Sequence, residues 1–460
     1  MKATVTHPRK FRATGSALPA AVPELPRRMT ARTRSLGAAL LGALVGPVLA
    51  AFLGGAMAQT TITFWPSSNP EEIQFATQIV SQWNGAHPEL QIKMQPLPAS
   101  RSTEEVLLAA IAARTTPDVA ANIYPGAISQ FVEAGGLYQH ESLPGFMEFM
   151  TERSGEDVVA LYTHPSGHVY QIPWKANPVM FAYNVKLLAE AGIEPGDLAT
   201  YTGFLEAAKK VEDHWGGEKH LYTPTVDVTW WQRFFDFYGL YIAASQGQTL
   251  LDEDGAVVFD NDAGREVFEF LATFFREGYA PKGQTAQNRF FQGTTLVEQA
   301  GPFTMPFYEN NAPEGFEFGL IPVPVPDRLA GQPVYTYGDP KNIAIFTTSK
   351  HPEEAWEFIE FILSPENDAL FMSITGQVPY RLGMTTDPLF TPILAEKPNL
   401  TAFLDQTART RGVDDTPYLI EIFTAISREY EAGVIQGVRE PAVALRRAAQ
   451  QAKDIISGFF

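Results

Sequence analysis

The side chains of this chain that could bind a ligand are aromatic rings and polar groups placed in or beside loops. Aromatic rings can pack against the C–H faces of a sugar, while sugar hydroxyls need polar side chains as hydrogen-bond partners. Trp65 ends an apolar segment, Trp174 follows a proline, and Trp230 and Trp231 are adjacent, so these two should point to different sides. The combination predicts noncovalent binding of a small polar solute such as a sugar.

Motifs for catalysis, nucleotide binding or metal binding are not found in the sequence. No phosphate-binding loop and no Gly-x-Ser-x-Gly elbow occurs, and the absence of cysteine excludes disulfides and thiolate chemistry. His164 and His168 are four residues apart, but a proline and a glycine between them prevent the helix that would align them on a metal. The acidic turn beginning at Asp252 has Ala263, not Glu, at the twelfth position of a calcium loop. We therefore expect neither a metal nor a cofactor.

An enzyme is the remote alternative for this chain. It has 52 Asp and Glu residues, so some pairs of carboxylates will lie close enough for glycoside hydrolysis by chance. No motif marks such a pair, so we expect a binding protein and keep a secreted carbohydrate-active enzyme as the remote alternative. The formal net charge of −18 argues against nucleic acid or an anionic membrane surface as a partner.

The first 58 residues have the pattern of an export signal. An apolar stretch from Leu36 to Leu53 follows several arginines and precedes Ala56-Met57-Ala58, a small-x-small cleavage site. Its length also fits a membrane anchor, but its glycines and the cleavage triplet favour removal. Met29 begins a compact signal by itself and is the alternative start. Because no cysteine is available for lipid attachment, we expect a periplasmic protein that is not a lipoprotein.

Behind this leader, short strands alternate with amphipathic helices. Strands are predicted over 62–65, 90–94 and 118–121, with helices over 71–83 and 103–113 between them. Such alternation indicates an α/β sheet with crossover helices.

Two lobes are predicted, with the chain passing between them near 168–173, at 321–326 and at 376–381. The segment 321–326 has a proline at every second position, which excludes a helix or an interior strand and suits an extended connection. Trp83 and Trp356 fall on inward helix faces and are expected in the cores.

Seven segments occur in a characteristic order, and each is weak evidence by itself. They are TITFW with QWNGAHPELQIKM, TTPDVAANIYPGAISQFVEAGGLYQ, GHVYQIPWKANPVMFAYNVKLLAEAGI, FFQGTTLVEQAGPF, FEFGLIPVPVP, NIAIFTTSKHPEEAWEFIEFILSPEN and GQVPYR. In this order they resemble the maltose-binding-protein-like family of extracellular solute-binding proteins (family 1). The resemblance covers nearly the whole chain after the leader.

This resemblance implies a two-lobed, type II periplasmic-binding-protein-like α/β fold with the ligand cleft between lobes joined by hinge crossings. The first lobe is expected over 59–170 with 331–376, and the second over 171–330 with 377–460. The implied function is that of a monomeric receptor of an ABC importer, which binds a sugar or polyol and delivers it to the permease in the membrane. Contacts from both lobes would favour the closed state once ligand is bound.

The resemblance also implies ligand contacts, position by position. Asn177 stands where relatives place a carboxylate that holds sugar hydroxyls, Phe303 matches an aromatic residue after Gly-Pro, and Arg381 matches a basic residue after a turn. The expected contacts are Trp65, Ser67, Asn69, Arg101, Asn122, Tyr124, Trp174, Asn177, Trp230, Trp231, Phe303, Asp339 and Arg381.

Departures from the family pattern leave a second ligand class open. Where relatives have an acid after the third strand, this chain has Asn122 and Tyr124, and the segment 337–341 lacks their stacking tryptophan. Basic residues near the expected cleft are Arg101, Lys175, Lys341 and Arg381. Since a buried anion requires cationic or backbone donors, the alternative ligand is an anionic sugar derivative, phosphorylated, sulfonated or uronic.

Overall fold

The computed structural model describes residues 59–98, 102–252, 254–283, 286 and 288–458. The predicted leader and Arg101 lie outside the described residues. Within these ranges, no helix has both the length and the apolar composition needed to cross a membrane.

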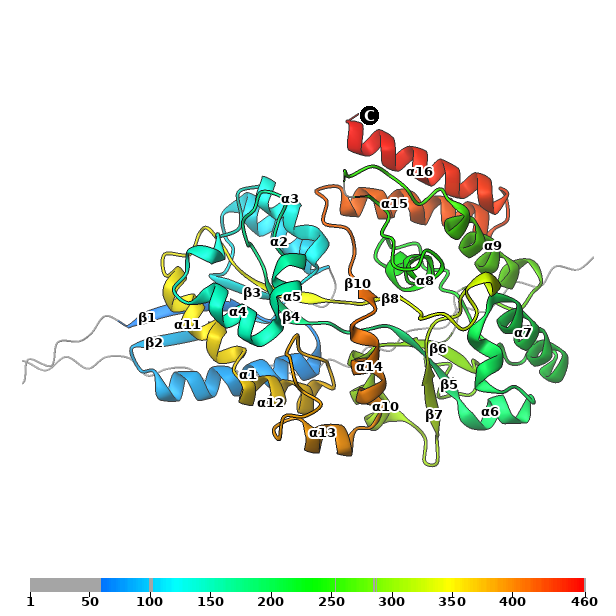
Figure 1. The fold of residues 1–460 in the computed structure, drawn as a ribbon, viewed down its shortest axis with the longest axis horizontal. Coiled ribbons are helices and arrows are strands. Elements are labelled where there is room, and N and C mark those ends of the chain that lie inside the picture. The colour runs from blue at the N-terminus through cyan, green and yellow to red at the C-terminus, as the bar shows by residue number, and fades with distance from the viewer. Residues whose placement is uncertain (1–58, 99–101, 253, 284–285, 287, 459–460) are drawn as a thin grey trace, which may run out of the picture. The chain divides into compact units, whose positions relative to one another are not determined.

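The first lobe is built on a five-stranded sheet in the order β2-β1-β3-β9-β4 (Figure 1). Its strands are β1 (Thr60–Trp65), β2 (Leu90–Met94), β3 (Val119–Ile123), β4 (Ile172–Lys175) and β9 (Lys341–Ile345). The first three strands are parallel, and β9 runs antiparallel to both β3 and β4. Parallel strands need crossover helices, which explains the strand–helix alternation in this part of the sequence.

Helices of the first lobe cover this sheet and bury its apolar side chains. They are α1 (Pro70–Ala86), α2 (Thr103–Ala113), α3 (Ile128–Glu133), α4 (Phe146–Ser154), α5 (Glu156–Leu161), α11 (Pro352–Ile362) and α12 (Pro365–Thr375). Asn69 caps α1 and Ser102 caps α2, each by accepting backbone N–H groups of the first turn. Trp83 and Trp356 are buried in this core, as predicted.

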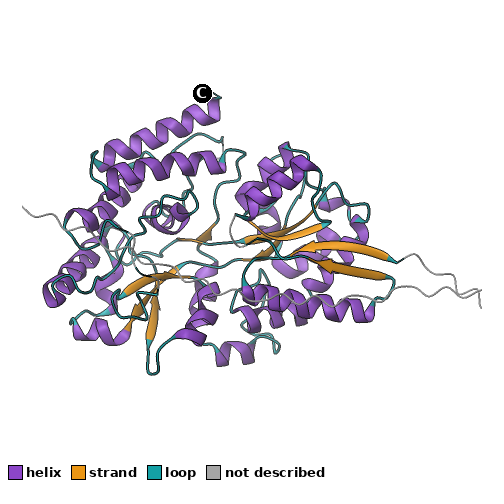
Figure 2. Cartoon of the chain, turned by 180° about the vertical axis from the view of Figure 1, so that it is seen from behind, coloured by secondary structure: helices purple, strands orange, loops and turns teal. Residues whose placement is uncertain are grey.

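The second lobe contains a three-stranded antiparallel sheet and most of the remaining helices. Figure 2 shows its strands grouped apart from those of the first sheet. The sheet has the order β6-β5-β7, from β5 (Met180–Asn184), β6 (Val297–Ala300) and β7 (Phe318–Ile321), and a short parallel pair joins β8 (Thr336–Tyr337) to β10 (Thr410–Arg411). The helices are α6 (Val185–Glu190), α7 (Tyr201–Trp215), α8 (Gly239–Ala244), α9 (Asp262–Arg276), α10 (Met305–Asn311), α13 (Thr391–Glu396), α14 (Asn399–Thr407), α15 (Leu419–Tyr430) and α16 (Pro441–Ser457).

The chain leaves the first sheet later than the sequence predicted. The expected crossing at 168–173 is wrong by a few residues, because β4 still pairs with β9 in the first sheet. The first crossing is the segment 176–179 between β4 and β5. It lies beside the segment 376–381, where Lys175 bridges Pro379 and the Ala176 N–H donates to the Val378 carbonyl.

The second crossing is not at 321–326. Val323 and Val325 of that segment are buried in the core of the second lobe, and Val325 bridges Thr200. The chain instead crosses at 338–340, between β8 of the second lobe and β9 of the first. The predicted lobe limits at 170 and 330 therefore shift to about 175 and 338.

Candidate functional site

A cavity of about 380 Å³ lies where the two lobes meet. The first lobe contributes the start of α2, the end of β3 and the start of β9, and the second contributes the loop before α8. The lining residues are Ser102, Thr103, Glu104, Glu105, Asn122, Tyr124, Thr229, Trp230, Trp231 and Lys341. Because both lobes supply walls, relative movement of the lobes would open or close this cavity.

Glu104 is the buried carboxylate of the cavity wall. It is only 1% exposed, and its Oε1 accepts the backbone N–H of Tyr124 at 3.0 Å. Its Oε2 is buried without a hydrogen-bond partner among the described residues. Burial raises the pKa of Glu104, although the nearby Lys341 ammonium lowers it.

The end of β3 brings Asn122 and Tyr124 into the cavity. Asn122 has φ +64°, a left-handed conformation that asparagine tolerates better than most residues, and it lies where the register between β3 and β9 shifts. Lys341 places its ammonium over the ring of Tyr124, a cation–π contact. Burial raises the pKa of the Tyr124 phenol well above its ordinary value.

Lys341 is already neutralised by a carboxylate of its own segment. Its Nζ donates to Asp339 Oδ1 at 2.6 Å, and the Tyr337 hydroxyl donates to the same oxygen at 2.9 Å. Burial lowers the pKa of Lys341, opposed by the carboxylates of Asp339 and Glu104. This ion pair spans the point where the second crossing enters β9.

Two tryptophans form the wall from the second lobe. Trp230 is buried, packs edge-on against Phe234 with 5.5 Å between ring centroids, and donates its Nε1 to Glu105 Oε1 at 3.4 Å. That long hydrogen bond crosses from one lobe to the other. Trp231 is half-buried and also lines the cavity.

The loop that carries these tryptophans is held by three sets of hydrogen bonds. Asp227 Oδ1 accepts both the N–H and the hydroxyl of Thr229, at 2.8 and 2.6 Å. Arg233, which is fully buried, donates to the Asp227 carbonyl at 2.7 Å, and Ser427 donates to the Val228 carbonyl at 2.7 Å. All of these hydrogen bonds lie within the second lobe. They fix the position of the loop, including its distance from α15.

Comparison with known proteins identifies the family. A sequence profile described as "Bacterial extracellular solute-binding protein" matches residues 78–402, most of the chain. The chain belongs to this family of bacterial extracellular solute-binding proteins. The arabinooligosaccharide-binding protein of Bacillus subtilis (strain 168) is 23% identical over 343 residues, which are 71% of this chain and 75% of that protein.

Solved structures support the two-lobed fold of this solute-binding protein. The uncharacterized protein lmo0859 from Listeria monocytogenes EGD-e superposes with a TM-score of 0.73 at 25% identity, covering 87% of this chain and 99% of that one. The cyclic alpha-maltosyl-1,6-maltose binding protein from Arthrobacter globiformis also gives 0.73, at 20% identity, covering 87% and 100%. The predicted fold class is confirmed.

Four of the predicted contacts meet in the cavity of this solute-binding protein: Asn122, Tyr124, Trp230 and Trp231. Asp339 lies next to them and holds Lys341. Asn177 is buried in the first crossing, where its Nδ2 donates to Gln377 Oε1 at 2.7 Å and its Oδ1 has no partner among the residues described. It does not line the cavity.

Several predicted contacts have structural roles instead. Asn69 Oδ1 caps α1, and Ser67 Oγ is buried and accepts the Asn69 N–H at 2.9 Å. Trp174 is buried in the first-lobe core beside Phe371, with 4.8 Å between ring centroids. Trp65 and Phe303 are half-buried and lie outside the cavity lining.

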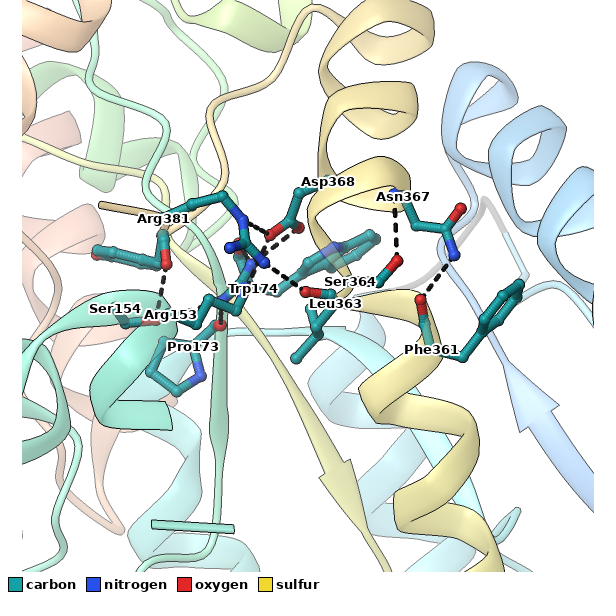
Figure 3. A network of polar contacts seen from close by, with 11 residues as sticks. Arg153, Ser154, Pro173, Trp174, Phe361, Leu363, Ser364, Asn367, Asp368 and Arg381 are labelled. Carbon is teal, nitrogen blue, oxygen red and sulfur yellow. Dashed lines mark hydrogen bonds and ion pairs between the residues drawn. The ribbon is translucent and has the colours of Figure 1, made fainter. Parts of the chain in front are cut away.

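Arg381 is part of an ion network (Figure 3). It is not among the residues that line this cavity, although it lines a second cavity of about 540 Å³. Its Nε donates to Asp368 Oδ2 at 2.7 Å and its side chain also donates to the Leu363 carbonyl at 2.7 Å. Asp368 is in turn bound by Arg153 through both carboxylate oxygens, at 2.8 and 3.0 Å. The interpretation of Arg381 as a ligand contact is not supported by this geometry.

The basic residues expected in the cleft are thus paired within the protein. Lys175 is buried and bound to Glu72, Lys341 is bound to Asp339, and Arg381 is bound to Asp368. Arg101 lies outside the described residues. This pairing disfavours the alternative of an anionic sugar derivative, since none of the three described cations is free to receive an anion.

Sequence reasoning missed the contribution of α2 to the site. Ser102, Thr103, Glu104 and Glu105 line the cavity from the first turn of that helix. The sequence indicated the acidic first turn and a cap at Thr103, where the structure has Ser102, but such features are common to many helices. What distinguishes the start of α2 from other helix starts is the hydrogen bond from the Tyr124 N–H to Glu104, which joins it to the end of β3.

Proposed function

We propose that this solute-binding protein binds a small sugar or polyol in the interlobe cavity and delivers it to the permease of an ABC importer. The proposal depends mainly on one observation: a cavity takes two tryptophans from one lobe and, from the other, polar side chains that include the buried, unpaired carboxylate oxygen of Glu104. Aromatic faces suit sugar C–H surfaces, and unpaired buried acceptors suit hydroxyl donors.

The size of the cavity favours a short ligand. Ligand sites usually enclose about 300–1,000 Å³, and about 380 Å³ lies near the lower end of that range. A mono- or disaccharide fits this volume better than a long oligosaccharide. The arabinooligosaccharide-binding protein and the cyclic alpha-maltosyl-1,6-maltose binding protein, to which the chain is similar, support a sugar as the class of ligand.

Closure of the lobes supplies the mechanism. A ligand that contacts both lobes binds the closed state more tightly than the open one, so it shifts the population toward closure. The permease then recognises the closed form, and no covalent step is required. We further propose that the chain is exported by its leader to the periplasm, is not lipid-anchored, acts as a monomer and does not turn over its ligand.

Calorimetry on residues 59–460 with neutral sugars, polyols and sugar phosphates tests this function. We expect saturable one-to-one binding of at least one neutral or amino-substituted sugar, weakened by Trp230→Ala, with the ligand recovered unchanged by chromatography. At 100 times the dissociation constant the ligand should stabilise the fold by about 2.7 kcal/mol. Binding of sugar phosphates alone, or conversion of the ligand into product, would contradict the proposal.

A further inference from the structure

Among the described residues, the wall of the cavity carries more negative than positive charge. Its described wall contains the carboxylates of Glu104 and Glu105 and the ammonium of Lys341, and the charge of Lys341 is matched by Asp339. The N-terminal end of α2 adds a partial positive charge of about half a unit, which does not cancel two carboxylates. The described wall therefore presents a net negative charge to an enclosed ligand.

Glu104 is the buried carboxylate of the cavity wall whose negative charge is incompletely compensated. Its Oε1 is occupied by the Tyr124 N–H, whereas its Oε2 has no donor within the described part of the chain, although the residue is only 1% exposed. A buried carboxylate oxygen without a donor is costly. A donor group on a ligand in the cavity would satisfy this oxygen.

Glu105 extends the negative surface toward the mouth of the cavity. It is exposed, and its Oε1 accepts a hydrogen bond from Trp230 Nε1 at 3.4 Å. A carboxylate and an indole side by side form a surface that attracts a cation by Coulomb and cation–π interactions. Trp230 and Trp231 supply the aromatic part of that surface.

From these observations we propose that the ligand is a cationic amino sugar, with its ammonium group donating to Glu104 Oε2 and its ring packed against the tryptophans. This inference rests on the proposed function and specifies its ligand class. A hydroxyl would satisfy the hydrogen bond of Oε2 but would leave the charge uncompensated when the lobes exclude water. An ammonium satisfies both, and its charge-assisted hydrogen bonds are about twice as strong as neutral ones.

Matched sugar pairs that differ in one substituent test this proposal by calorimetry on residues 59–460. The pairs are glucosamine with glucose, galactosamine with galactose, mannosamine with mannose, and the β-1,4-linked glucosamine dimer with cellobiose and with the N-acetylated dimer. We expect at least one amino sugar to bind about ten to a hundred times more tightly than its neutral partners at low salt. Raising the ionic strength should reduce this preference.

Substitution of Glu104 separates the contribution of its charge to binding from the contribution of its hydrogen bonds. Glu104→Gln keeps an oxygen that can accept the Tyr124 N–H but removes the charge, so the amino-sugar preference should fall to less than about threefold. Glu133→Gln, an exposed carboxylate on α3 outside the cavity lining, is the matched control and should leave the preference unchanged. Circular dichroism of both variants establishes that each is folded.

The possible results distinguish this inference from the proposed function. If a neutral sugar binds as tightly as its amino partner, or if Glu104→Gln retains the preference in a folded protein, the cationic ligand class is wrong and a sugar-binding protein remains. If no sugar of either kind binds, both the inference and the proposed function are overturned.

Discussion

Replacing Asp368 by asparagine should destabilise the first lobe more than any change to its partner Arg381. Asp368 is fully buried and receives three charge-assisted hydrogen bonds, two from Arg153 and one from Arg381. Arg153 is itself only 2% exposed and also donates to the Pro173 carbonyl at 2.7 Å. The network therefore ties α4 and α12 to the strand from which the first crossing starts (Figure 3).

The magnitude follows from what each substitution leaves behind. Asp368→Asn removes the anion and leaves the buried Arg153 without a counter-charge, and breaking a buried ion pair in this way costs about 3–5 kcal/mol. Arg381→Met leaves Asp368 still bound through both oxygens to Arg153, and it removes one charge-assisted bond at a side chain that is 13% exposed. We expect a loss of about 1–2 kcal/mol for that variant.

Urea unfolding of residues 59–460, followed by both circular dichroism and tryptophan fluorescence, measures these differences. Coincidence of the two probes tests whether one free energy of unfolding describes the transition. Both variants should keep the wild-type affinity for a bound sugar, because the network does not line the cavity. A loss below about 1 kcal/mol for Asp368→Asn would refute the stability argument. Lost sugar binding in a stable Arg381→Met protein would restore Arg381 as a ligand contact.

Three further predictions concern the cavity, lobe closure and acid stability. Trp231→Ala should weaken sugar binding about tenfold by removing an aromatic wall, with unfolding by urea changed little, since Trp231 is only half-buried. At Gly126 an added Cβ would lie 2.6 Å from Val413 of the other lobe, so Gly126→Val should hold the lobes apart. Calorimetry should then show at least tenfold weaker sugar binding by this variant. Small-angle scattering should show that the variant does not become more compact when the sugar is added. Burial lowers the pKa of His140 to about 4 from its ordinary 6.5. Between pH 6.5 and pH 4, His140 therefore binds a proton in the unfolded chain but not in the folded chain. The free energy of unfolding should fall by up to about 3 kcal/mol as the pH is lowered through this range. His140→Gln should show a shallower pH dependence in the same urea titrations.

The regular elements near the start of the fold could be predicted because local sequence determines them. The helix predicted over 103–113 and the strand over 90–94 match α2 and β2, and the strand predicted over 62–65 lies within β1. Periodicity and capping residues carry this information. The alternating prolines of 321–326 correctly indicated an extended segment. They could not indicate which lobe it packs on, because that depends on partners such as Thr200 far away in the sequence.

The candidate site could be predicted only in part, both for its aromatic and for its charged side chains. Trp230 and Trp231 line the cavity, whereas the other aromatic residues predicted as contacts, Trp65, Trp174 and Phe303, do not. The cations could not be assigned, because each partner lies elsewhere in the chain, such as Glu72 for Lys175. A basic residue beside a cleft is free or neutralised according to contacts that spacing along the sequence does not reveal.

The pairing of these cations determines the sign of the charge in the cleft. Lys175 and Lys341 flank the two crossings and are bound to Glu72 and Asp339, so their positive charges are already paired within the protein, although Lys341 itself lines the cavity. The unpaired charge that remains is on α2, whose positive N-terminal end stabilises carboxylates in its first turn. The helix end favours the ionised form of a carboxylate such as Glu104, whereas burial raises its pKa, so a cationic donor enclosed when the lobes close would favour the ionised form further. Closure and ligand charge are coupled for this reason: excluding water from the cavity is least costly when the enclosed ligand brings the missing positive charge.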